Sequence, residues 1–167
     1  MQPRTQNRRG NTLIEFTLVG IPVMFVLIST FEMARGMWIY HTLAYAIKEG
    51  TRFAIVHGQN CTTAPNTCGK AIQDVATVVK NAGAGLNASQ LSLTFSSASN
   101  AAVTCTLNNC LSNATAWPQY PDNQPGLLIG INGIYPFQSA IAMFWPGAGS
   151  GITFGVAYFP AGSREIV

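Results

Sequence analysis

The feature that most constrains this chain is a long apolar run near its N-terminus that contains a single carboxylate. Residues 11–31 carry one charged side chain, that of Glu15. As an α-helix with a rise of ~1.5 Å per residue, this run spans about 30 Å, the thickness of the hydrocarbon core of a bilayer. It therefore predicts a transmembrane helix. A carboxylate within such a helix costs on the order of 2.5–3.5 kcal/mol at mid-bilayer, so Glu15 marks a functional position.

A basic leader, residues 1–10, precedes the apolar run. It carries three arginines and no acid, and it ends in Gly10. Because basic residues stay on the cytoplasmic side of a membrane, the leader places Met1 in the cytoplasm and the C-terminal part of the chain outside it. Gly10 lies five residues before Glu15, and this spacing predicts cleavage between Gly10 and Asn11.

Two other interpretations of the same segment explain less of it. An ordinary secretory signal peptide would be cut near Ala34, but Glu32 would then occupy the −3 position and Glu15 would lie in the apolar core of the signal. An uncleaved anchor explains the span but explains neither Glu15 nor the boundary at Gly10.

Cleavage after Gly10 would make Asn11 the new N-terminus and Glu15 the fifth residue of the mature chain. The new amino group and the carboxylate of a neighbouring subunit would then neutralise each other, which offsets the desolvation of both charges. This arrangement resembles the class III signal of type IV pilins and pseudopilins.

The resemblance covers the N-terminal third well and becomes patchy beyond it. It includes residues 8–18 with the pair Glu15–Phe16, then Pro22, residues 31–36 and residues 46–54, and weaker matches at 81–86, 91–95 and 163–165. These stretches are similar to the TadE-like family, the minor pilins or pseudopilins of tight-adherence (Flp) pilus systems. The resemblance implies a role in assembling a type IV-like adhesive pilus, with other pilins and a prepilin peptidase as partners. It also implies a single-pass protein of the bacterial inner membrane with a periplasmic head, in which Glu15 and Phe16 act in assembly.

Composition argues against several other functions. Charged residues make up 9% of the chain, against roughly 25% in a soluble domain, and such a surface suits an extracytoplasmic or assembled protein. The net charge of +3 equals the charge of the three arginines in the leader, so the rest of the chain is close to neutral. Because no basic stripe is present, nucleic-acid binding is not expected.

Four cysteines form two local pairs along the chain, Cys61 with Cys68 and Cys105 with Cys110. Neither spacing is typical of a zinc site. An even count downstream of a membrane segment indicates disulfides in an oxidising compartment. Three connectivities are compatible with four cysteines; we favour the local pairing, and buried free thiols are the alternative.

The chain offers little for catalysis. It has two histidines, His41 and His57, and six acids without a dense cluster, and it lacks the nucleophile elbow, the Walker loop and the H-E-x-x-H motif. We expect His57 to interact with the last carbonyls of a helix. The sequence therefore predicts no enzyme, and no cofactor, metal or small-molecule site. The alternative from another class is a signal-anchored extracytoplasmic binding or enzymatic domain.

The predicted fold class is α+β, with a long N-terminal helix packed on a small antiparallel sheet and one further helix. The expected parts are the leader 1–10, the transmembrane segment 11–31, a continuation of the same helix over 32–57, and an extracytoplasmic head over 58–167. Pro22 lacks an amide N–H and should kink or locally open the helix. Alternating spacings of four and three predict the helix face that packs on the head: Met33, Met37, Tyr40, Ala44, Ile47, Thr51 and Ala54.

Within the head, periodicity predicts a helix over 70–82 that buries Ile72, Val75, Ala76 and Val79. Strands are expected where Leu91, Leu93 and Phe95 alternate with polar residues, and over 102–107, 127–135 and 152–159. Gly130 and Gly133 weaken the third strand. We expect a turn at Asn108–Asn109, a long loop over 112–126, and a short helix or loop over 138–145. Five aromatic residues are predicted to pack in the core or, alternatively, to form an exposed patch: Trp117, Tyr120, Phe137, Phe144 and Trp145.

Overall fold

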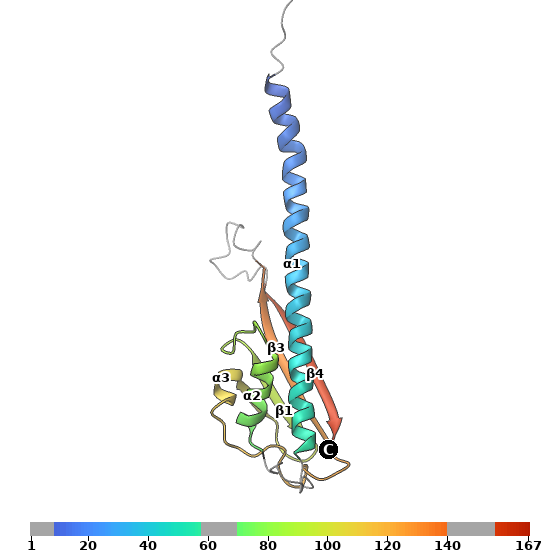
Figure 1. Ribbon diagram of the computed structural model, residues 1–167, viewed down its shortest axis with the longest axis vertical. Coiled ribbons are helices and arrows are strands. Elements are labelled where there is room, and N and C mark those ends of the chain that lie inside the picture. The colour runs from blue at the N-terminus through green and yellow to red at the C-terminus, as the bar shows by residue number, and fades with distance from the viewer. Residues whose placement is uncertain (1–8, 58–69, 140–155) are drawn as a thin grey trace, which may run out of the picture. The chain divides into compact units, whose positions relative to one another are not determined.

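The computed structural model describes residues 9–57, 70–139 and 156–167. By its internal contacts the chain divides into two compact units, residues 1–35 and residues 36–167. The elements in chain order are α1 (Arg9–Val56), α2 (Ile72–Ala82), β1 (Ser92–Ser97), β2 (Val103–Thr106), α3 (Leu107–Cys110), β3 (Leu128–Gln138) and β4 (Val156–Ile166) (Figure 1).

The four described strands form one antiparallel sheet in the order β2-β1-β3-β4. Leu93 of β1 lies opposite both Cys105 of β2 and Gly133 of β3, and Ile131 of β3 lies opposite Ser163 of β4. The long N-terminal helix, the small antiparallel sheet and the additional helices confirm the predicted α+β class.

The core of the head lies between one face of this sheet and the two longer helices, α1 and α2 (Figure 1). Leu91, Leu93 and Phe95 are fully buried, which confirms the predicted alternation along β1. The predicted buried face of α2 is also confirmed, because all four of its members are buried: Ile72, Val75, Ala76 and Val79.

The face of α1 that contacts the sheet differs from the prediction. Met33 and Met37 are 76% and 63% exposed, so the prediction is wrong for these two residues. Tyr40 is 44% exposed but contacts Phe159 of β4 edge to face at 6.2 Å. Apolar residues occur on several sides of α1, and spacing alone did not select among them. The observed contact face uses small residues that let the neighbouring elements approach. Its buried members are Gly36, Leu43, Ala46, Ile47, Gly50, Thr51 and Ala54.

Glycines permit this close packing at two points. A Cβ on Gly50 would lie 2.5 Å from Cγ2 of Val79 on α2, and a Cβ on Gly133 of β3 would lie 2.5 Å from Cδ1 of Ile47 on α1. Glycine inside a strand often marks a close approach of another backbone. Gly133 therefore stabilises the sheet in this fold by admitting α1, although the sequence suggested that it would weaken β3.

The observed ends of several elements differ from the predicted ones. β3 continues to Gln138, beyond the predicted end at Tyr135, and β4 continues to Ile166, beyond the predicted end at Phe159. Asn108 and Asn109 lie in the short helix α3 and not in a simple turn. Most of the predicted segment 138–145, and residues 152–155 of the predicted last strand, lie outside the described residues.

Candidate functional site

The N-terminal half of α1 presents an almost entirely apolar surface. Every residue from Leu13 to Phe31 is exposed, except Gly20, which is half-buried. The hydroxyl of Thr17 donates to the carbonyl oxygens of Leu13 and Ile14, at 3.1 and 3.0 Å, and the hydroxyl of Thr30 donates to Val26 at 2.8 Å. Among the described residues, α1 is the one helix long and apolar enough to cross a membrane. Hydroxyls bonded within the helix suit a hydrocarbon surrounding, where no water would satisfy them.

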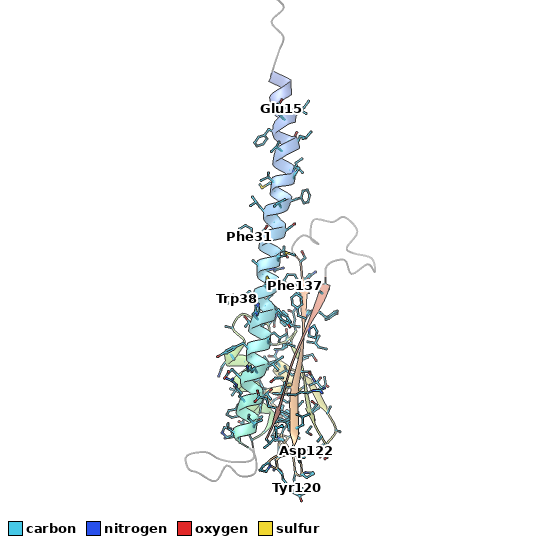
Figure 2. All side chains as sticks on the ribbon, turned by 90° about the vertical axis from the view of Figure 1, so that its right-hand side faces the viewer. Glu15, Phe31, Trp38, Tyr120, Asp122 and Phe137 are labelled. Carbon is cyan, nitrogen blue, oxygen red and sulfur yellow. A yellow bond between two sulfur atoms is a disulfide. The ribbon has the colours of Figure 1, made fainter. Side chains whose placement is uncertain are left out.

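The predicted cleavage and assembly residues lie together at the start of α1. The helix begins at Arg9, so Gly10 and Asn11 lie in its first turn, and Glu15 and Phe16 follow one turn later. Positions four apart fall on the same side of a helix, so positions 11 and 15 share one face of α1. Figure 2 labels Glu15 near this end of α1, and its side chain is exposed.

A shallow apolar groove follows these residues. Its centre is Gly20, where an added Cβ would lie 3.9 Å from Cε1 of Phe16, an ordinary contact distance. Small residues of this kind let a second helix approach closely within a membrane. The groove is lined by Phe16, Thr17, Gly20, Ile21, Met24, Phe25 and Ile28.

α1 continues through Pro22 as one helix. The kink expected at this proline stays a prediction.

The head contains a disulfide between Cys105 and Cys110, which joins β2 to α3. The Cα atoms of the two residues are 5.5 Å apart. This is the local pairing that the spacing favoured. The other predicted pair, Cys61 with Cys68, lies outside the described residues.

The two histidines contact aromatic rings. The Nδ1–H of His57 donates to the carbonyl oxygen of Phe53 at 2.7 Å, one turn before the end of α1, which confirms the interaction expected for this residue. His41 is exposed and meets Tyr40 edge to face at 5.9 Å. In the part of the chain that the structure describes, no group of three His, Cys, Asp or Glu residues is arranged to hold a metal ion.

Asp122 is a buried carboxylate that sequence reasoning missed. It accepts hydrogen bonds of 2.9 Å from the backbone amides of Ser99 and Asn100, and one of 2.9 Å from the side-chain amide of Asn100. Burial by itself raises the pKa of this carboxyl, but hydrogen bonds from the Ser97 side chain and from the Ser99 and Asn100 backbone outweigh that effect and lower the pKa to about 2. The group therefore fastens the loop after β1 to the loop before β3. The Pro-Asp-Asn sequence around it is the only signal that pointed to a structured turn.

The predicted aromatic group has mixed positions. Trp117 is buried against Phe95, with ring centroids 5.1 Å apart, while Tyr120 is 70% exposed. Phe137 is half-buried, and Phe144 and Trp145 lie outside the described residues.

Comparison with known proteins finds a similarity in the N-terminal segment. The family model described as TadE-like protein matches residues 10–52, which confirms the resemblance inferred from sequence over that segment. The match contains Gly10, Glu15 and the apolar part of α1, and it ends before the sheet begins. No curated protein and no solved structure matches the chain. The match and the apolar helix together indicate a membrane-anchored protein related to the Tad pilus.

Proposed function

We propose that this TadE-like protein is a minor pilin or pseudopilin that acts in the assembly of a tight-adherence (Flp) pilus. The observation that carries the proposal is the position of Gly10 and Glu15 within a segment that matches the family model, at the start of an exposed apolar helix. The partners we propose are other pilins of the same system and a prepilin peptidase. The function is assembly, and no catalytic role is proposed for the head.

The proposal places the protein in the bacterial inner membrane as a single-pass subunit. The arginines of the leader favour a cytoplasmic N-terminus. The disulfide between Cys105 and Cys110 supports an oxidising location for the head, the periplasm. A protease added outside spheroplasts should digest the head of the native protein. Digestion only after the inner membrane is broken would contradict this orientation.

Removal of the leader is the first step of the proposed function. We expect a membrane peptidase that cuts after Gly10 to accept only a small residue at this position. Gly10→Val should therefore leave the leader attached. Thr5→Val is the matched control, because it adds the same side chain within the leader but away from the cleaved bond. N-terminal sequencing of both variants purified from the host decides the point. We expect Asn11 as the first residue of the control and Met1 as the first residue of Gly10→Val.

Glu15 supplies the second test. When Glu15 meets the amino terminus of a neighbouring subunit, each charge offsets the desolvation of the other, and removing one partner of such a buried pair costs about 3–5 kcal/mol. Glu15→Ala should therefore insert in the membrane normally and lose its leader, yet fail to bind partner pilins. Alanine costs the bilayer less than a carboxylate, so insertion should not suffer.

The control for this variant is Glu32→Ala. Glu32 lies on the same helix and forms a 3.1 Å ion pair with Arg35, so its loss removes an equal charge without touching the proposed assembly contact. The measurements are co-purification of partner pilins and counts of pili in cells that carry only the variant. Normal assembly by Glu15→Ala would favour the alternative function, an anchored extracytoplasmic domain.

A further inference from the structure

Among the described residues, one end of the head carries aromatic side chains and no Lys, Arg, Asp or Glu. We call it the aromatic end and define it as Met37, Trp38 and Tyr40 of α1 together with Phe137, Tyr158 and Phe159 of β3 and β4. Residues 36–46, 134–138 and 156–160, which contain these six, include no Lys, Arg, Asp or Glu. Figure 2 labels Trp38 and Phe137 at this end of the head, and Tyr120 and Asp122 at the opposite end.

Contacts between rings hold the strands of the aromatic end against α1. Phe137 and Phe159 stack with their centroids 5.2 Å apart, and Phe159 meets Tyr40 edge to face at 6.2 Å. Both rings lie against Gly36 of α1, where an added Cβ would meet Cζ of Phe159 at 3.6 Å and Cζ of Phe137 at 3.7 Å, ordinary contact distances. Through Tyr40, α1 therefore contacts the paired ends of β3 and β4.

The strands at this end extend beyond the rest of the sheet. β1 pairs with β3 only as far as Ile134, whereas β3 and β4 stay paired from Tyr135 opposite Phe159 to Gln138 opposite Val156. Phe137 and Phe159 lie on the face that contacts α1, and Tyr158, which pairs with Pro136, lies on the other face. Both faces of this two-stranded extension thus carry an aromatic ring, and Gln138 is its one polar residue.

The aromatic end is open to its surroundings. Trp38 and Tyr158 are each 67% exposed, although they come from elements 120 residues apart in the chain, and Met37 is 63% exposed. The middle of the same outer sheet face is polar by contrast, with Thr94 and Thr104 paired through their hydroxyls at 3.0 Å. An exposed aromatic surface of this kind marks an interaction site.

We propose that the aromatic end rests in the headgroup layer of the membrane that holds α1, an inference that depends on the membrane anchoring proposed above. Trp38 follows the last residue of the apolar run, Phe31, by seven residues, within two helical turns of α1. Tryptophan and tyrosine concentrate at the boundary between hydrocarbon and water, because their rings are apolar and their N–H or O–H groups need polar partners.

The charged residues between the apolar run and Trp38 in the sequence support the same partner. Between Phe31 and Trp38 the only charged residues are Glu32 and Arg35, which form an ion pair at 3.1 Å and carry no net charge. A surface without net charge fits zwitterionic phospholipid and has no electrostatic requirement for anionic lipid. Docking would fix the head against the bilayer before assembly, and extraction of the subunit into a filament would have to break this contact.

Quenching of tryptophan fluorescence by brominated lipids tests the proposal. The full chain is reconstituted in liposomes of phosphatidylcholine that carries bromine on the acyl chains just below the headgroup. Trp38→Phe and Trp145→Phe form the background, and Trp117 is kept as a constant signal because it is buried in the core. Single tryptophans are then introduced as Tyr158→Trp in the aromatic end and as Tyr45→Trp, the control. Tyr45 is 58% exposed on α1 but lies two turns further along the helix.

Phe25→Trp, within the apolar run, reports on anchoring separately. We expect bromine to remove most of the fluorescence added by Phe25→Trp and by Tyr158→Trp, and little of that added by Tyr45→Trp.

Quenching at position 25 without quenching at position 158 would overturn the docking and leave the anchor intact, and another protein subunit would then be the occupant of this surface. Equal quenching at 158 and 45 would also overturn it, because the head would then lie on the bilayer by its side. An unquenched Phe25→Trp would overturn both anchoring and docking. Near-UV circular dichroism in the same liposomes shows that each variant is folded.

Discussion

Replacing Asp122 by asparagine should destabilise the head and should do so only above acidic pH. The carboxylate is fully buried. Its Oδ2 accepts hydrogen bonds from the backbone amides of Ser99 and Asn100 and from the side-chain amide of Asn100, and its Oδ1 accepts a further bond of 3.1 Å from the Ser99 amide. Asparagine keeps one acceptor oxygen but turns an NH₂ group toward amides that can only donate. With that oxygen at the Oδ2 position, the NH₂ group faces the Ser99 amide that donates to Oδ1 in the native protein, so this bond is replaced by a contact between two donors.

The size of the effect follows from these contacts. A hydrogen bond to a charged group contributes about 1.5–3 kcal/mol net, and a buried donor without a partner costs about 1–3 kcal/mol. Ser99 is exposed and Asn100 is half-buried, so water can replace part of what is lost. We therefore expect Asp122→Asn to lower the free energy of unfolding by about 2 kcal/mol. For a domain of this size that is a fall in Tm of about 6–10 °C.

The pH dependence has a definite sign. The folded pKa of Asp122, about 2, lies below its ordinary value of 3.8. A group whose pKa is lowered by folding stabilises the protein fully above its unfolded pKa and loses this contribution as the pH falls through the folded one. The difference in Tm between the native protein and Asp122→Asn should therefore be largest at neutral pH and shrink between about pH 5 and pH 2.

Thermal unfolding of the full chain in detergent, followed by near-UV circular dichroism, measures both effects. Glu49→Gln is the matched control, because Glu49 forms an exposed 3.4 Å ion pair with Arg52. Such surface pairs contribute about 0–1 kcal/mol, so the control should change Tm by a few degrees at most. The reasoning is refuted if Asp122→Asn unfolds at the native Tm at pH 7, or if its deficit persists unchanged at pH 2.

Two further predictions concern packing and covalent structure. Gly133→Ala should lower stability by about 1–3 kcal/mol through overpacking, because its Cβ would lie 2.5 Å from Cδ1 of Ile47. Chemical denaturation measures the loss of stability, and adding Ile47→Val to this variant should restore part of it. If stability is not restored, contact with Ile47 is not the cause of the loss. Replacing both Cys105 and Cys110 by serine should lower the free energy of unfolding by about 2 kcal/mol in the chain-entropy model. Equal denaturation midpoints for this variant and the native protein would contradict that estimate.

Much of the fold could be predicted from local patterns. The helical run through residues 11–31 is fixed by its apolar composition, and the burial of Leu91, Leu93 and Phe95 follows from strict alternation. These predictions succeeded because each depends on the periodicity of a single element. Glu15 was noticeable for the same reason, since a carboxylate inside an apolar run is conspicuous without knowledge of any neighbour.

Other features depended on contacts between segments far apart in the chain. Met37 and Leu43 are both apolar residues of α1, yet Met37 is exposed and Leu43 is fully buried. The choice is made by β3, where Gly133 leaves space for Ile47 and Leu43. Asp122 likewise looks like an ordinary loop residue until the fold brings the amides of Ser99 and Asn100 to it.

The sequence by itself therefore determined which segments form the long helix, the second helix and the first strand of the sheet, and which residue of the apolar run is exceptional. Tertiary structure alone decided which side of α1 contacts the sheet, how far β3 and β4 extend, and that Trp38 lies at the same end of the head as the paired ends of these two strands. The physical reason is one of range. The periods of helices and strands arise from interactions within a few residues. Close packing selects contacting side chains by their shape and leaves the others exposed, and this selection depends on the whole chain.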